Sequence, residues 1–518
     1  MQAAALPAQR KAESGVLPWL TAPAMLLCTA LLTGLFLLVE LPPLVDVPGH
    51  IGSAAIEAAR PGNALRGYFQ WNWALIPNLG GQVVMKLLAY PFGILAAGWW
   101  TSLIATVCLA LGAMATIRAL NPRGASAMGW AMIFVFAFPW VWGFINYILA
   151  TGLGLLLFAA AVHLRAKPRL RAVLLLVGQP IVIMCHAIGG LILPILVAAE
   201  SLGAALDDMK VQPELGRKAV LTRLLRECWP LAATPLLIAA WKVLASTSAG
   251  SGIAWDVLAK LDFLMEVLRD QSLVLDMGSA VACYMIVMFG YLLGARWTWR
   301  QGLPALAVFA AYCLMPARIG GSEAVDVRLL PTAMLLALGL QDWSKASART
   351  VRLVALSGAA ILAVRFGAIL ASFPTYDANF RAQLEALDHV APGSRMLVYR
   401  RQSCSNVQWR MSRIDTLPAL ASLEKQVWIN SHWMIPGLDM LQTRFTPAPE
   451  GSAALSPMVW DLRCPDSDGR SLDEIVGRAP LSRVDYLWLI DTGSPRTLPS
   501  MLDKQWQWQE SALYRVRH

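Results

Sequence analysis

Long apolar runs recur along the first 372 residues of this 518-residue chain, and they constrain its fold more than any other feature. Most runs are about 15 to 24 residues long, and about 20 apolar residues cross a bilayer as a helix. Hydrophobic residues make up 57% of the chain and charged residues only 15%, a composition typical of membrane proteins. The sequence therefore predicts a polytopic α-helical membrane protein with about eleven transmembrane helices, at 16–39, 96–117, 125–141, 144–164, 171–187, 188–206, 229–245, 277–294, 302–316, 328–342 and 352–372.

The character of the sequence changes after residue 372. The last part has frequent charges, Pro-Gly turns and short alternating apolar segments. Its spacing predicts a helix over 376–390, which Pro392 and Gly393 end, and strands at 395–400, 484–490 and 511–516. We therefore expect two domains, a membrane domain over 1–372 and a small soluble α/β domain over 373–518.

Basic residues predict the orientation of the chain. The Lys and Arg residues concentrate in the short loops between runs, and eleven spans place all these loops on the cytoplasmic side. Arg10 and Lys11 precede the first run, so we expect a cytoplasmic N-terminus. An odd number of spans puts the C-terminal domain on the outer side. The first run is long and has no cleavage pattern, so we interpret it as a retained span and not a signal peptide. The same distribution accounts for the net charge of +10 without a nucleic-acid partner.

Two of the eight cysteines, Cys404 and Cys464, lie in the polar C-terminal part, and the others are mostly within apolar runs. Their spacing is unlike that of a metal site. A disulfide between them is possible if this part lies outside the cytoplasm, and two free thiols are the alternative.

The outer loop 40–95 is too mixed in composition for clean spans. It holds Tyr68, Phe69, Trp71 and Trp73, followed by a short apolar stretch at 83–88. Aromatic residues favour the membrane–water interface, so we expect short amphipathic helices lying there. The alternative is a hairpin of two further spans, in which case the basic loops would no longer all lie on the cytoplasmic side.

Asp46 and His50 directly follow the first run, where a span meets water. Ionisable groups at a membrane boundary are costly and tend to be functional. A carboxylate there can take a proton from an acceptor hydroxyl, and a histidine can orient it, contact a phosphate or bind a metal. The structural alternative is that Asp46 caps a short helix over 48–60, with Glu57 and Arg60 on its wet side.

A phosphate-bearing substrate would need cations on the outer side. Arg328 lies at the edge of an apolar run, and a guanidinium suits bidentate phosphate contact. Its alternative role is an ion pair with Glu323 or Asp326. Further candidate cations are Arg318, Lys86, Arg60 and Lys242.

Three more residues are candidates for the same cavity. His186 lies at the turn of an expected outer hairpin, and its alternative is a packed polar contact. Asn146 lies in an expected tight turn, where an asparagine is ordinary. Glu57 follows the acidic loop and is a candidate as well as a solvated surface residue.

The layout resembles the GT-C superfamily of polytopic glycosyltransferases. Asp46 after the first run, the long outer loop, the many further runs and the outer C-terminal domain match that family, and 142–147 is similar to its Gly-x-x-Asn outer turn. The resemblance implies transfer of a hexose or pentose from a polyprenyl-phosphate carrier to a lipid, glycan or protein acceptor, at the outer face of the bacterial cytoplasmic membrane. It implies that Asp46 is the base. The common form of the family signature pairs two acidic residues closely, whereas this sequence has His50 near Asp46.

The sequence leaves some choices open. A transporter or lipid flippase is the alternative from another class, with His186 and Lys242 near membrane depth, and a non-catalytic scaffold is a third. No cofactor is indicated with certainty, although a divalent metal is possible. Asp46 and His50 alone are too few ligands to define a metal site.

Overall fold

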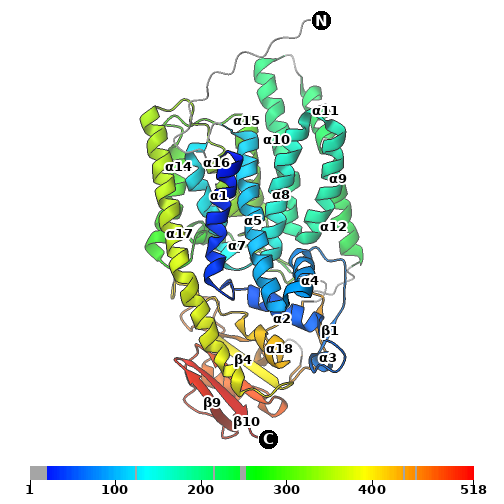
Figure 1. Ribbon diagram of the computed structural model, residues 1–518, viewed down its shortest axis with the longest axis vertical. Helices are drawn as coiled ribbons and strands as arrows, with labels where there is room; N and C mark the ends of the chain where they lie inside the picture. Colours follow the sequence, from blue (N-terminus) through cyan, green and yellow to red (C-terminus); the bar gives the residue numbers. More distant parts are fainter. Residues whose placement is uncertain (1–19, 123–124, 214–215, 245–251, 436–437, 450–451) are drawn as a thin grey trace.

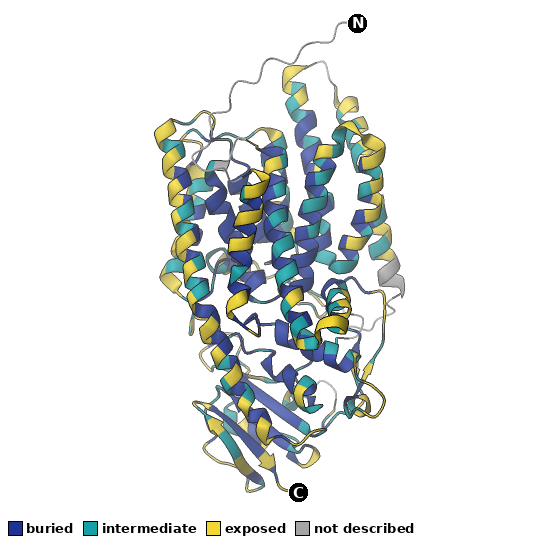
Figure 2. Cartoon of the chain, in the orientation of Figure 1, coloured by how far each residue is buried: buried dark blue, intermediate teal, exposed yellow. Residues whose placement is uncertain are grey.

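A computed structural model describes residues 20–122, 125–213, 216–244, 252–435, 438–449 and 452–518. Long helices run side by side along the longest axis, and a β-sheet lies at one end of the bundle (Figure 1). Exposed residues lie on outward-facing helices such as α17 (Ala348–Leu384), whereas buried residues fill the interior (Figure 2).

Each of the eleven predicted runs coincides with a helix or with a series of short helices. Within the described ranges, five helical segments are long and apolar enough to cross a membrane: Ile94–Leu120, Ile145–Ala166, Pro168–Cys185, Ala187–Val211 and Ala348–His389. Shorter apolar segments are Ala22–Leu38, Met128–Val141, Leu273–Phe289 and Leu329–Gly339. The chain is a polytopic helical membrane protein, and the count of eleven stays a prediction. The helices at these runs are α1 (Ala22–Thr33) with η1 (Gly34–Leu38), α5 (Ile94–Leu120), η2 (Ala125–Ala127) to α7 (Phe138–Val141), α8 (Ile145–His163), α9 (Pro168–Cys185), α10 (Ala187–Val211), η5 (Trp229–Ala232) with α12 (Ala233–Leu244), α14 (Leu273–Phe289), α15 (Trp299–Leu314), α16 (Leu329–Gly339) and α17.

The last helix corrects one expectation. The sequence predicted a span ending at 372 and a separate helix over 376–390, but α17 is one helix of 37 residues that contains Pro374. Its buried face continues across the proline, with Phe373 on one side and Phe380 on the other. Packing of these rings offsets the hydrogen bond that a proline removes. One stiff helix of about 55 Å therefore joins the bundle to the C-terminal region.

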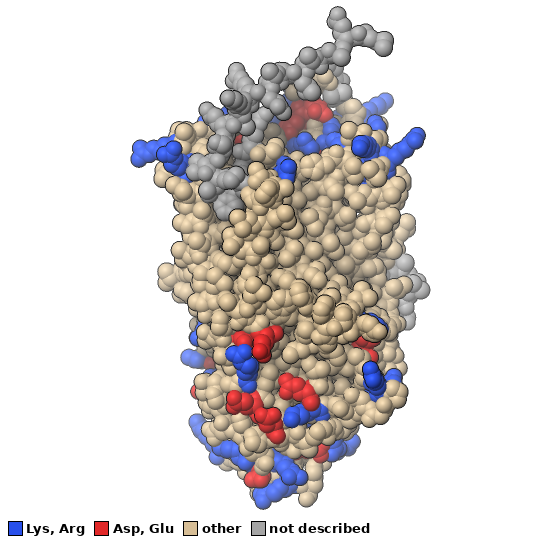
Figure 3. All heavy atoms as spheres, viewed as in Figure 1, with Lys and Arg blue, Asp and Glu red and all other residues tan. Residues whose placement is uncertain are grey.

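The predicted basic loops do lie together at the end opposite the sheet. The carboxylate of Glu200, in the second half of α10, binds Arg165 at 2.6 Å and Arg300 at 2.5 Å. The backbone of Arg296 pairs with that of Asp342. Figure 3 shows Lys and Arg gathered at this end and a broad band without charged residues across the middle of the molecule. Which side of a membrane this end faces stays a prediction.

A six-stranded mixed sheet forms the C-terminal region. Its order is β5 (Trp428–Ile429), β4 (Arg395–Gln402), β8 (Tyr486–Ile490), β10 (Ser511–Val516) and β9 (Leu502–Trp508), and β7 (Met458–Trp460) pairs with the far end of β4. Pairing is parallel from β4 to β5, β7 and β8, and antiparallel from β8 through β10 to β9. The three strands predicted from the sequence are β4, β8 and β10, and they are confirmed.

The central strands are apolar on both faces. On β4, Met396 and Val398 belong to the main core that continues into the helical bundle, whereas Leu397 and Tyr399 belong to a second core below the sheet. This alternation follows from the two-residue period of a strand. The second core also takes in Phe69 of the outer loop. Loop, sheet and bundle therefore pack as one continuous body.

The outer loop contains α2 (Val47–Glu57), α3 (Leu65–Tyr68), β1 (Phe69–Trp71) and α4 (Gly80–Phe92). The longest of these helices has 13 residues, too few to cross a bilayer, which takes about 20. The alternative of two further spans is therefore wrong. Strand β1 pairs antiparallel with β6 (Leu441–Thr443) of the C-terminal region, so the loop is fastened to that region.

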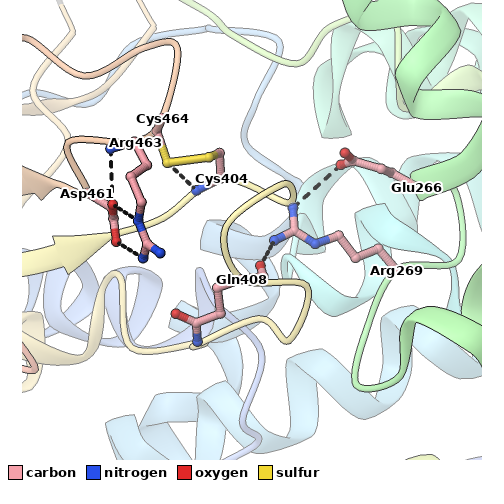
Figure 4. The surroundings of a disulfide bond; sticks show 7 residues. All are labelled: Glu266, Arg269, Cys404, Gln408, Asp461, Arg463 and Cys464. Carbon is pink, nitrogen blue, oxygen red and sulfur yellow. Dashed lines mark hydrogen bonds and ion pairs between the residues drawn. A yellow bond between two sulfur atoms is a disulfide. The ribbon is translucent and has the colours of Figure 1, made fainter.

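The structure joins Cys404 to Cys464 in a disulfide, 60 residues apart in sequence (Figure 4). It links the segment after β4 to the segment after β7. Of the two alternatives that the sequence left open, a disulfide and two free thiols, the structure has the disulfide.

We predict that replacing Cys404 and Cys464 together by serine destabilises the C-terminal region. In the chain-entropy account, closing a loop of this length contributes about 4 kcal/mol to the free energy of unfolding. The measurement is proteolytic resistance of the purified protein as temperature rises. Cys313→Ser, which removes an exposed free cysteine, is the control, and equal resistance of the double variant and this control would contradict the prediction.

Candidate active site

Asp46 lies where the outer loop meets the turn between α7 and α8. Its backbone N–H donates to the carbonyl of Trp142 at 2.8 Å, and the N–H of Val45 donates to Val141 at 3.2 Å. Gly143 makes this approach possible, since its φ is +73° and an added Cβ would lie 3.0 Å from Leu44 and 3.1 Å from the nitrogen of Asp46. Glycine tolerates both the left-handed backbone and the close contact. The 142–147 turn therefore fixes the position of Asp46.

Asp46 occupies the N-cap position of α2, but its side chain makes no capping hydrogen bond. Pro48 follows at N2 and has no N–H. The next amide, that of Gly49, donates to Oγ1 of Thr416 at 2.9 Å, and Thr416 donates onward to the carbonyl of Val45 at 2.6 Å. A residue of the C-terminal region thus takes the capping role that the sequence offered as the alternative for Asp46. The Asp46 carboxylate has no hydrogen bond or ion pair among the residues that the structure describes.

The surroundings of Asp46 favour its protonated form. Burial raises the pKa of this carboxyl from 3.8 to about 8, and the nearby carboxylate of Asp415 adds to the rise. Arg328 and Arg400 act in the opposite direction. Burial dominates because few polar atoms replace the water lost around the charge. A carboxyl group that titrates near neutral pH suits proton transfer.

Arg328, the residue before α16, is buried, with only 9% of its surface exposed. The sequence left open an ion pair with Glu323 or Asp326, but the carboxylate of Glu323 pairs with Arg318 at 3.1 Å and that of Asp326 pairs with Lys260. From Glu323, Arg328 receives only a contact with the backbone carbonyl, to which its Nη2 donates at 3.2 Å. Within the described ranges this buried guanidinium has no carboxylate bonded to it.

The remaining contacts of Arg328 do not neutralise it. Its Nη1 lies 2.8 Å from Nε2 of His186, while Nδ1 of the same ring faces the amide of Gly189 at 3.2 Å. A neutral imidazole has one lone pair to offer, so two donors compete for it. The guanidinium also lies over the ring of Phe144, at 4.3 Å from its centre. His186, which the sequence placed near the cavity, therefore lies against Arg328. The arginine keeps the capacity to bind an anion.

The C-terminal region contributes two ionisable residues that sequence reasoning missed. Arg400 on β4 and Asp415 form a nearly buried ion pair at 3.2 Å, and both act on the charge of Asp46. They lie more than 350 positions from Asp46 in the sequence, and no local pattern marks them. Only the packing of the sheet against the outer loop brings them to Asp46.

His50, Glu57 and Lys86 form a separate group. They line a small pocket together with Trp73 and Gln82. Lys86 binds Glu57 at 2.5 Å and lies 4.4 Å from the centre of the Trp73 ring. Lys86 is thus already paired, unlike Arg328.

His50 belongs to this pocket and has no described hydrogen bond to the Asp46 carboxylate. Its Nδ1 lies 3.5 Å from the amide of Gln82, and its ring lies 5.1 Å from that of Trp433. Burial lowers the pKa of His50 to about 4, so it is neutral at pH 7. The spacing of four residues along α2 does not bring the two side chains together.

The other candidates lie elsewhere. Asn146 accepts from the amide of Gly81 and donates to Asn78 at 2.8 Å, which fastens α8 to the start of α4. Arg318 is exposed and paired with Glu323. Arg60 is also exposed, and the side chain of Lys242 lies outside what the structure describes.

The described part of the chain has no group of three or more His, Cys, Asp and Glu side chains placed to hold a metal ion. What this part does offer is a free carboxylate beside a buried guanidinium. The guanidinium can hold a phosphate, and the carboxylate can take a proton. Both lie at the end of the bundle that the C-terminal region covers.

The fold is similar along almost the whole chain to that of ArnT from Cupriavidus metallidurans. For ArnT in the apo state the similarity covers 95% of this chain and 97% of that one, with 12% sequence identity and a TM-score of 0.49. For ArnT bound to undecaprenyl phosphate the coverage is 96% and 98%, with 12% identity and a TM-score of 0.45. No protein-family model and no curated protein matches the sequence. The likeness is one of overall architecture.

We predict that the stability of the Asp46→Asn variant relative to the wild type increases as pH rises. The pKa of Asp46 is about 8 in the folded protein and 3.8 as the ordinary value, so the folded state holds the proton more tightly than the unfolded state. Wild-type stability then falls as pH increases between about 4 and 8, and the asparagine variant lacks this loss. Apparent melting temperatures of both proteins from pH 5 to pH 9 measure the effect. A difference that does not change with pH would contradict the assignment.

Proposed function

We propose that this protein is a membrane glycosyltransferase that moves a sugar from a polyprenyl-phosphate carrier to an acceptor hydroxyl. The observation that carries the proposal is the pair formed by the unbonded carboxylate of Asp46 and the buried guanidinium of Arg328, which has no bonded carboxylate. Burying a charge without a partner is costly. Such a group fits a site whose partner arrives with the substrate.

The two side chains divide the reaction between them. Asp46 takes the proton of the acceptor hydroxyl as its oxygen attacks the anomeric carbon. The bond between that carbon and the phosphate oxygen breaks, and its electron pair leaves with the polyprenyl phosphate. Arg328 binds the phosphate and stabilises the negative charge that grows on it. The proton on Asp46 then passes to water.

Neighbouring residues set the conditions for these two. His186 and Phe144 hold the Arg328 side chain in place. The ion pair of Asp415 with Arg400 places one charge of each sign near Asp46, so the pKa of the base depends on the C-terminal region. His50, Glu57, Lys86 and Asn146 remain candidates for contacts with other parts of the substrates.

The location follows from the same arrangement. We propose that the end bearing the sheet faces the outside of a bacterial cytoplasmic membrane and that the basic end faces the cytoplasm. A lipid-linked donor can then stay in the bilayer while its phosphate reaches Arg328. The transferred sugar is a hexose or a pentose, and the acceptor is a lipid, a glycan or a protein.

A transporter or flippase fits the charge distribution less well. Transport sites lie near the middle of the membrane, whereas Asp46, Arg328 and Asp415 lie together at one end of the bundle. Consumption of a polyprenyl-phosphate sugar by purified protein without any ion gradient distinguishes the two functions.

We predict that Arg328→Gln weakens binding of undecaprenyl phosphate to the purified protein by about 10- to 100-fold, since it removes charged hydrogen bonds to the phosphate. Arg318→Gln is the matched control, because Arg318 is exposed and already paired. Asp46→Asn should retain binding. The measurement is microscale thermophoresis in nanodiscs. Equal affinity of the Arg328 and Arg318 variants would remove the proposed phosphate site.

We predict that Asp46→Asn reduces sugar transfer by about 100- to 10,000-fold, the usual contribution of general acid–base catalysis. In the wild type, kcat/KM should increase about tenfold per pH unit below pH 8 and level off above it, because the carboxyl titrates at a pKa of about 8. Release of undecaprenyl phosphate from a sugar-loaded donor measures both effects. A pH-independent rate from pH 6 to pH 9 would argue against Asp46 as the base.

A further inference from the structure

A cavity of about 290 Å³ lies between the C-terminal region and the end of the helical bundle. Its lining contains Val45 and Trp142 from the bundle side, and residues of the segment 401–415 from the C-terminal side. Lys86 and His50 are not part of it, and neither is Arg328. Of the residues in the proposed transfer reaction, Asp415 lines this cavity, but no substrate group has been placed in it.

The 403–415 segment, which forms one wall, is held firmly. The disulfide at Cys404 fixes its start, and the carbonyl of Cys404 accepts from the amides of Val407 and Gln408 at 3.1 and 2.9 Å. Arg269, from the connection before α14, donates to the carbonyl of Gln408 at 2.8 Å (Figure 4). It also donates to the carbonyl of Trp409 at 2.8 Å.

Four further contacts hold the rest of the segment. The indole of Trp409 donates to Asp276 at 2.8 Å, and the amide of Met411 donates to the carbonyl of Asp270 at 3.1 Å. Arg413 is buried, pairs with Asp270 and donates to the carbonyl of Pro43 at 3.0 Å. The wall is therefore rigid before any ligand binds, which lowers the entropic cost of binding.

The lining residues offer both hydrogen-bond donors and hydrogen-bond acceptors. They provide amides and hydroxyls, such as those of Gln402 and Ser412, alongside an indole and both signs of charge. Arg401 is matched by Glu510 at 3.0 Å. Balanced donors and acceptors next to an aromatic ring suit a neutral, hydroxyl-rich ligand better than a polyanion.

Two polar groups of the lining have no partner. The Nε1 of Trp142 and the Oγ of Ser403 are buried and make no hydrogen bond in the described structure. Arg410 has no bonded carboxylate in that part of the chain, and its Nε only approaches the hydroxyl of Tyr376, at 3.4 Å. These groups of the lining residues keep unused hydrogen-bonding capacity.

The cavity lies next to the segment that holds Asp46, and Arg328 is not part of its lining. Asp415, which acts on the charge of Asp46, lines the cavity, as does Val45, the preceding residue in the chain. The Trp142 carbonyl accepts the Asp46 amide at 2.8 Å. The ring of Phe144 lies 5.9 Å from that of Trp142, and the guanidinium of Arg328 stacks over the Phe144 ring. A ligand in the cavity would thus lie close to Asp46 without occupying the place of a phosphate on Arg328.

We infer that this cavity is the acceptor subsite and that it binds a single neutral sugar residue through Trp142, Gln402 and Arg410. This inference rests on the proposed transferase function. Its volume is at the low end of small-ligand sites, which span about 300 to 1,000 Å³, so the cavity takes one sugar ring and not a folded chain. The acceptor hydroxyl then points toward Asp46, and the rest of the acceptor extends outward past the exposed side chains of Arg401 and Gln408.

The test uses the full-length protein in nanodiscs and a mixture of methyl glycosides of common hexoses and pentoses as probes. Saturation-transfer difference NMR reports glycoside binding, and microscale thermophoresis reports binding of undecaprenyl phosphate to the same samples. Ser412→Phe fills the cavity, and Arg410→Gln removes one donor group without adding bulk. Arg515→Gln, on the exposed side of β10, is the matched control.

We expect a glycoside signal from the wild type and from Arg515→Gln, its loss in Ser412→Phe, and about tenfold weaker binding in Arg410→Gln. All four proteins should bind undecaprenyl phosphate equally. A wild type that binds undecaprenyl phosphate but no glycoside, or a signal that neither cavity variant changes, overturns the acceptor subsite and leaves the proposed function intact. A wild type that fails to bind undecaprenyl phosphate overturns the proposed function and the acceptor role with it.

Discussion

The hydrogen bond from the Gly49 amide to Thr416 is the contact on which the arrangement of this site depends. It satisfies the start of α2 from outside the helix, where proline at the second position leaves one fewer amide to bond. Asp46 therefore stands at a helix N-terminus with nothing to cap. The same threonine ties the outer loop to the C-terminal region through Val45. The side chain of Thr416 therefore both caps α2 and attaches the C-terminal region to the outer loop.

Arg328 shows how neighbouring charges can isolate a buried cation. Two carboxylates lie within five positions of it in the sequence, but Lys260 binds one and Arg318 binds the other. Arg328 is left with a backbone carbonyl, an aromatic face and a shared imidazole. Such an environment holds the guanidinium in place without neutralising it. The contrast with Lys86, already bound to Glu57, singles out Arg328 among the basic candidates.

The C-terminal region takes part in the chemistry as well as covering it. Sequence reasoning found no second carboxylate close to Asp46, and the fold brings Asp415 near it from 369 positions away. A like charge at this place adds to the effect of burial on the pKa of Asp46. The disulfide, the Arg269 contacts and the buried Arg413–Asp270 pair all fix the segment that ends at Asp415. Stability of this segment and protonation of Asp46 are therefore connected.

The sequence by itself determined the features that depend on near neighbours. Apolar runs located the helices, basic loops identified their common end, and alternating segments located β4, β8 and β10, because these patterns report the environment of each short stretch. Only the tertiary structure decided which charges meet. It placed His50 apart from the Asp46 carboxylate, carried α17 through Pro374, and supplied Thr416 and Asp415 to the Asp46 loop. Whether a charged side chain is paired or free depends on residues hundreds of positions away, and local sequence holds no record of them.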